Sequence, residues 1–104
     1  MRVRRWDEGR LGPLNEEAAQ KRFHPALYEV AVREVAPATR VSGEAPQRTL
    51  IALEGRWVLE ADGQRTFVQP GDMVEVSSGK FTFETSEPVR YVAAYPLPPE
   101  KVLN

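Results

Sequence analysis

The chain has 104 residues, of which 41% are hydrophobic and 28% charged, as expected for one soluble domain with a single hydrophobic core. A formal net charge of -1 offers no electrostatic basis for nucleic-acid or anionic-membrane binding, and no apolar run approaches a membrane span. We therefore expect a cytoplasmic protein with neither partner. The absence of cysteine excludes disulfides, thiolate nucleophiles and sulfur-based zinc sites.

Residues 1–25 are predicted to form a polar arm and one short helix. The Arg-rich residues 2–6 suit an arm or a solvated edge strand. Asn15 is followed by two glutamates, which is typical of a helix N-cap and first turn. The helix is expected over residues 15–23, because the next two residues are His24 and a proline. His24 is the only histidine, and we interpret it as a partly exposed end-cap residue.

From residue 26 onward the apolar residues recur with the period of two that indicates β-strands. "LYEVAVREV" is the first such stretch, "APATR" after it indicates a turn, and the pattern assigns no further strand before Arg48. The next long stretch, "RTLIALEGRWVLEADG", is interrupted at Gly55, which suggests a bulge or corner. Its Asp-Gly end indicates a hairpin, and "QRTFVQ", "PGDMVEVSSG", "FTFET" and "VRYVAAY" are the remaining strands. Short strands with regular turns predict an antiparallel sandwich or barrel.

Within residues 49–79, the segment "LIALEGRWVLEADGQRTFVQPGDMVEVSSG" resembles the core of a small single-domain cupin. The resemblance extends over roughly residues 27–96. It implies an all-β, antiparallel cupin-type jelly-roll barrel with one short N-terminal helix. The single domain then divides into the arm and helix, a barrel over residues 26–96, and a Pro-rich tail over residues 97–104.

The resemblance also identifies the positions at which many cupins bind a divalent metal. In that family two histidines and a glutamate come from one motif and a histidine from a second. Here Thr82 occupies the second-motif histidine position and Arg48 the glutamate position. The histidine pair falls, depending on a one-residue gap, on Ser42 and Glu44 or on Val41 and Gly43. Three or four converging donors are needed, so we expect no metal and no cofactor.

Side chains at and around these positions are the candidates for a ligand pocket. Strand alternation puts Glu84 on the same face as Thr82, and Arg48 faces inward if the family glutamate does. We therefore predict an ion pair between Arg48 and Glu84 in place of the metal, with Thr82 hydrogen-bonded nearby. Met73 shares a strand face with Glu75. The complete set of candidates is Arg48, Thr82, Glu84, Glu75, Trp57 and Tyr91.

Three functions remain open from the sequence. The first is a metal-free cupin barrel that binds a small polar or anionic molecule. The second is a metal-independent isomerase or epimerase acting on an oxygen-rich small molecule, with Glu84, Glu75 or Tyr91 as acid or base. The third is a structural or interaction barrel without a ligand, which a filled interior would favour. We also expect a homodimer, because an open barrel of this size leaves strand edges to cover.

Overall fold

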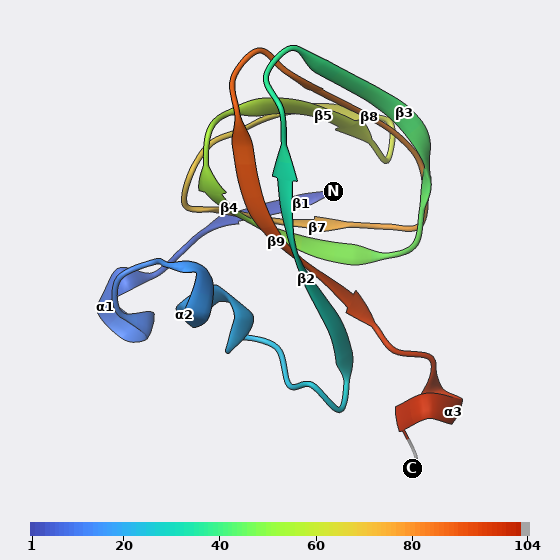
Figure 1. Cartoon of the computed structure of the whole chain (residues 1–104). Coiled ribbons are helices and arrows are strands. Elements are labelled where there is room, and N and C mark those ends of the chain that lie inside the picture. Colours follow the sequence, from blue (N-terminus) through green and yellow to red (C-terminus); the bar gives the residue numbers. More distant parts are fainter. Residues whose placement is uncertain (103–104) are drawn as a thin grey trace.

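The computed structural model describes residues 1–102 and consists of two antiparallel sheets packed face to face (Figure 1). The five-stranded sheet has the order β1-β7-β4-β9-β2 and the four-stranded sheet the order β3-β8-β5-β6. The strands are β1 Arg2–Arg5, β2 Tyr28–Val35, β3 Thr39–Ala45, β4 Arg48–Glu54, β5 Trp57–Ala61, β6 Gln64–Val68, β7 Asp72–Val76, β8 Gly79–Thr85 and β9 Val89–Pro96. The predicted all-β class is confirmed. Among the described residues no helix is long and apolar enough to cross a membrane.

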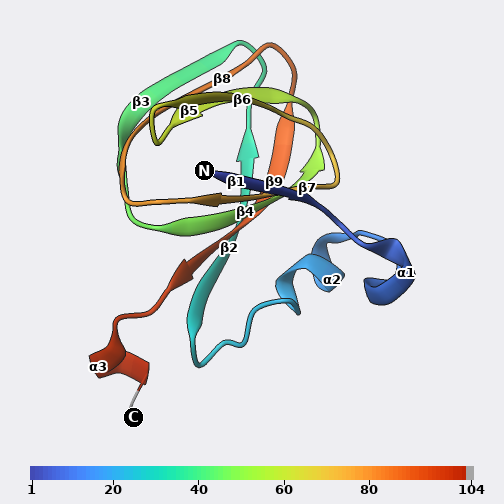
Figure 2. The same cartoon turned by 180° about the vertical axis from the view of Figure 1, so that it is seen from behind.

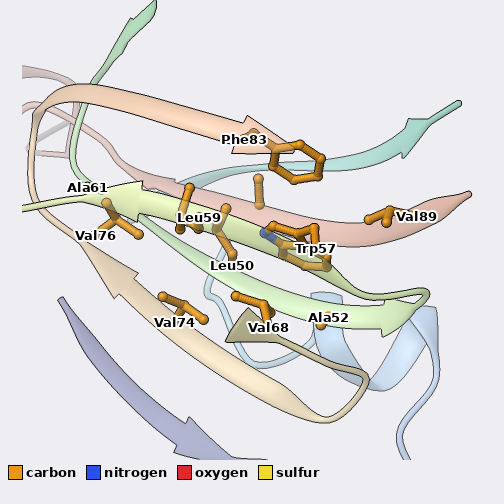
Figure 3. Packing of buried hydrophobic residues seen from close by; sticks show 11 residues of the cluster. Leu50, Ala52, Trp57, Leu59, Ala61, Val68, Val74, Val76, Phe83 and Val89 are labelled. Carbon is orange, nitrogen blue, oxygen red and sulfur yellow. The ribbon is translucent and has the colours of Figure 1, made fainter. Parts of the chain in front are cut away.

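The main core lies between the two sheets. Leu50 and Ala52 of β4 face inward, as strand alternation requires, and meet Trp57 and Leu59 of β5. These four side chains are 4% exposed or less. Figure 3 shows them together with the inward side chains of neighbouring strands. Burial of this apolar surface is the main force that holds the sheets together.

A second apolar cluster covers the opposite face of the five-stranded sheet. Ile51 of β4, Met73 of β7 and Val92 of β9 point outward there. Trp6 and Ala19 from the N-terminal segment pack on them, and Figure 2 shows that segment beside the sheet. The face of β4 that carries Ile51 is therefore covered by the chain's own N-terminal segment.

The helices are shorter and more numerous than the sequence predicts. Asn15 does cap α2, Glu16–Gln20, by accepting a hydrogen bond from the backbone N–H of Ala18 at 2.8 Å. The chain then turns instead of continuing to residue 23. Two further one-turn helices, α1 Glu8–Leu11 and α3 Pro99–Val102, were not predicted. Four residues span about one turn, too short for a periodic apolar pattern to appear in the sequence.

Strand β3 was also missed, although the remaining strand predictions are confirmed. Its burial pattern shows no alternation, because residues 40–44 are all exposed. The stretch predicted to bulge at Gly55 is two strands, with a register shift between Ala52 and Glu54 and a turn at Gly55. The hairpin at residues 62–63 is present, joining β5 to β6.

Candidate functional site

The register of β8 places Thr82 and Glu84 on the outer face of the four-stranded sheet. Phe83, between them, belongs to the core and is 6% exposed. Neighbours along a strand point to opposite faces, so the prediction that Thr82 and Glu84 face the interior is wrong. The Thr82 hydroxyl instead lies 3.1 Å from the Ser42 hydroxyl on the outer face. A shift of one residue in the register of β8 would exchange its two faces. In the structure, Phe81 and Phe83 occupy the inner face.

Arg48 does face inward, as predicted, but its contacts differ from those expected. The side chain is 6% exposed. Its Nη1 donates a hydrogen bond to the Pro46 carbonyl at 3.1 Å, and its guanidinium carbon lies 5.2 Å from the centre of the Phe81 ring. Glu84 is on the other side of the sheet, so the predicted Arg48–Glu84 ion pair is wrong. Within residues 1–102, no carboxylate forms a salt bridge with Arg48.

The centre of the sandwich is filled by aromatic side chains. Trp57 stacks on Phe83 with ring centroids 5.2 Å apart, and the Tyr91 ring lies 5.4 Å from Trp57. Figure 3 shows Phe83 beside Trp57. The Trp57 indole N–H is buried without a hydrogen-bond partner among the described residues. Two predicted ligand-stacking candidates, Trp57 and Tyr91, thus contact each other within the core.

Arg48 and Tyr91 influence each other's protonation. Burial lowers the pKa of the Arg48 guanidinium, an effect opposed by Tyr95, Tyr91 and Asp62. Burial also raises the pKa of Tyr91, with Tyr95 adding to the rise and Arg33 and Arg48 opposing it. Tyr91 therefore stays a neutral hydroxyl, which suits a hydrogen-bond donor better than a general base.

Glu75, a further candidate, lies on the outer face of the five-stranded sheet. It shares that face with Met73, as predicted, and pairs with Arg4 at 2.8 Å. Glu75 and Glu84 are consequently on outer faces of different sheets. The three residues proposed as acid or base in the enzyme alternative, these two and Tyr91, do not meet at one site.

A polar cavity of about 440 Å³ opens at the end of the sandwich where β4 begins. This volume lies within the usual range for small-molecule sites. Two arginines and one glutamate line it, together with hydroxyl and amide groups. The lining residues are Met1, Arg2, Tyr28, Gln47, Arg48, Thr49, Glu75, Val76, Ser77 and Pro96. Sequence reasoning identified only Arg48 and Glu75, because the others come from strand ends whose proximity depends on the pairing of β1, β4, β7 and β2.

Two larger hollows lie on the outer face of the four-stranded sheet. Thr82 lines one of about 800 Å³ and Glu84 one of about 680 Å³. Both candidates therefore contact surface concavities, which are separate from the cavity that Arg48 lines.

The positions that would hold the family's metal do not fit one. Val41 is opposite Phe83 and Gly43 is opposite Phe81, so these two are the inward residues of β3. Neither has a donor atom in its side chain, and the inward residue of β4 is the cation Arg48. Across the described part of the chain, no three or more His, Cys, Asp or Glu residues group to form a metal site. His24, whose Nδ1 accepts from the Ala26 N–H at 3.0 Å, caps an exposed turn.

The fold has clear relatives among solved structures, whereas the sequence matches no family model and no curated protein. A cupin domain of an XRE family transcriptional regulator from Enterobacter cloacae aligns with a TM-score of 0.61 and 15% identity over 92% of this chain and 95% of that one. A cupin-2 domain protein from Shewanella frigidimarina aligns with a TM-score of 0.56 and 19% identity over 67% of this chain and 71% of that one.

A conserved protein of unknown function from Streptococcus pyogenes aligns with a TM-score of 0.61 and 13% identity over 69% of this chain. The chain spans 66% of that protein, and 58% of a putative ethanolamine utilization protein from Salmonella typhimurium with a TM-score of 0.57. Identities this low speak for architecture alone. The two antiparallel sheets and these structural neighbours together show that the chain has a cupin-like fold.

Proposed function

We propose that this protein binds a small anionic molecule through Arg48, in the cavity at the end of the sandwich. The observation that carries the proposal is a cation that is 6% exposed and forms no salt bridge among the side chains of residues 1–100, although the Asp62 carboxylate acts on its charge from a greater distance. Burying a charge without a counter-ion costs several kcal/mol. A bound oxyanion would offset that cost.

The surroundings of Arg48 suit an oxyanion better than a cation. The guanidinium has five N–H donors, of which one is used in the hydrogen bond to Pro46. Arg2 adds a second positive charge to the cavity lining, and Glu75 is already paired with Arg4. Thr49 and Ser77 bring hydroxyl groups to the same lining. A planar guanidinium favours carboxylate, phosphate or sulfate groups.

The aromatic centre favours a second candidate, a barrel without an internal ligand that supports an interaction surface. Trp57, Phe83 and Tyr91 pack on one another between the two sheets. In that case Arg48 serves the packing of Phe81, to which it is stacked at 5.2 Å. The two candidates differ in what happens when Arg48 is replaced.

The test is thermal unfolding in sulfate, phosphate or malonate, against chloride at matched ionic strength. An anion that binds at Arg48 raises the stability by about 2.7 kcal/mol at a hundred times its Kd, which is a shift in Tm on the order of 10 °C. We expect the shift in the unmodified protein and not in Arg48→Gln. Arg22→Gln, which removes an exposed arginine, is the control and should keep it.

An equal shift in Arg48→Gln would refute the proposal. Arg48→Met without added anion separates the alternatives further. If Arg48 is an unpaired buried cation kept for a ligand, Arg48→Met should be neutral or stabilising. A loss of several kcal/mol together with no anion response would support the barrel without a ligand.

A further inference from the structure

The long edge strand β2 has one side that no other strand covers. It is the last strand of the five-stranded sheet and pairs with β9 alone (Figure 1). It runs eight residues from Tyr28 to Val35. Unpaired edges of this length offer a row of free N–H and C=O groups to another strand.

One hydrogen bond reveals which β2 residues point their backbone groups outward. The Leu97 N–H donates to the Leu27 carbonyl at 2.9 Å, continuing the register in which Tyr28 faces Pro96. Residues in an antiparallel pair alternate between bonded and non-bonded positions. The backbone N–H and C=O groups of the odd-numbered β2 residues therefore bond to β9, and those of the even-numbered residues point away from β9. Pro96, which has no N–H, stands at a non-bonded position, as this phase requires.

Two exposed charged side chains on β2, those of Glu29 and Arg33, enter no salt bridge with the side chains of residues 1–100. They lie on the same strand face, opposite Tyr95 and Tyr91 respectively. Four residues of strand separate them by roughly 13 Å, so they cannot pair with each other. A partner strand could pair with both.

We propose that two copies of this chain associate antiparallel along β2, with Ala31 of one copy facing Ala31 of the other. In this register Glu29 of each copy faces Arg33 of the other, and Val30 of each faces Val32 of the other. The even-numbered residues become the hydrogen-bonded pairs, in agreement with the phase set by Leu97. Two opposite-charge pairs and two apolar pairs follow from a single two-fold axis, and each favours pairing. The five-stranded sheets of the two copies then join into one continuous sheet.

The other sheet edges fit a second copy less well. β1 has arginines at three of its four positions, so self-pairing brings like charges together. On β6, Arg65 already pairs with Glu60 at 3.0 Å. β3 contains Arg40 and Glu44 but also Gly43, which weakens a strand. Arg40 is therefore a matched control position, an exposed arginine on a different edge strand.

The experiment measures mass by light scattering and sedimentation over about 1 to 300 µM, a range in which association shifts by mass action. The unmodified chain should approach the dimer mass. Arg33→Glu and Glu29→Arg each convert two attractive pairs into two repulsive ones, so each should weaken self-association about tenfold or more. Arg40→Glu should leave it unchanged. Circular dichroism checks that each variant keeps its strand content.

The decisive test is whether two charge-reversed variants associate with each other. A mixture of the Arg33→Glu chain with the Glu29→Arg chain pairs opposite charges at both positions, so a heterodimer should form at the unmodified affinity. The double variant Glu29→Arg with Arg33→Glu should regain the homodimer. A monomer throughout the concentration range, a loss caused by Arg40→Glu instead, or a mixture that stays monomeric would overturn the proposal.

Discussion

Replacing Gly55 with alanine should destabilise this protein far more than the same change at Gly63. Both glycines have positive φ values, +77° and +70°, a region that L-residues rarely adopt. They differ in the space around the missing Cβ. At Gly55 a Cβ would lie 2.1 Å from the Pro88 carbonyl oxygen and 3.0 Å from Val89, whereas at Gly63 no heavy atom lies within 4 Å.

The expected loss of stability follows from the backbone conformation and from the space around the added Cβ. A Cβ in the left-handed region costs about 1 to 2 kcal/mol, and the reduced freedom of the unfolded chain returns about 0.4 to 1 kcal/mol of it. Both apply equally at Gly55 and Gly63. Only Gly55→Ala must also displace the Pro88 backbone, an overpacking strain of about 1 to 3 kcal/mol or more. The difference between the two variants therefore isolates the steric contact between the β4–β5 and β8–β9 turns.

Equilibrium urea unfolding of both variants measures this difference directly. In a thermal scan, each kcal/mol corresponds to a fall in Tm of about 4 to 8 °C for a domain of this size. We expect Gly63→Ala within about 1 kcal/mol of the unmodified protein and Gly55→Ala about 2 to 4 kcal/mol below it. Equal losses at the two positions would show that backbone conformation, and not the Pro88 contact, requires glycine at residue 55.

Two further predictions concern polar groups that join distant turns. The Met1 amino group, 3.1 Å from the Asp62 carboxylate, and the Ser77 N–H lower the pKa of Asp62 below its ordinary 3.8. The ionised carboxylate therefore stabilises the fold at pH values above the pKa of Asp62 in the unfolded chain. This stabilisation is lost as pH falls through the lower pKa of the folded state. Asp62→Asn should thus lower Tm at pH 7, and the difference from the unmodified protein should shrink as pH falls through the folded-state pKa of Asp62, so a difference that stays constant would contradict the prediction. Thr85 is 4% exposed, and its hydroxyl lies 2.9 Å from the Arg56 carbonyl and 2.6 Å from the Glu87 carbonyl. Thr85→Val should therefore lower the free energy of unfolding in urea by about 1 to 3 kcal/mol. The control Thr82→Val, at a partly exposed position, should change it by less than about 0.5 kcal/mol, and equal losses would refute the role of burial.

The strands with regular alternation could be predicted from sequence because their chemistry is local. In β2, Tyr28, Val30 and Val32 recur every second position, whereas β4 and β9 are runs of β-forming residues between turn signals. The Asp-Gly pair at residues 62–63 specifies a two-residue turn. Asn15 likewise signals a helix start through its own hydrogen bond. Each signal depends on residues within a few positions of one another.

Which face of each strand points inward was decided by the tertiary structure. Thr82, Phe83 and Glu84 alternate in either register, and only the packing of Phe83 on Trp57 determines that the threonine and glutamate lie outside. The Arg48 cavity likewise depends on strand ends far apart in the chain. Alternation specifies which residues share a face, whereas the choice between the two faces depends on the total apolar surface that the whole fold buries.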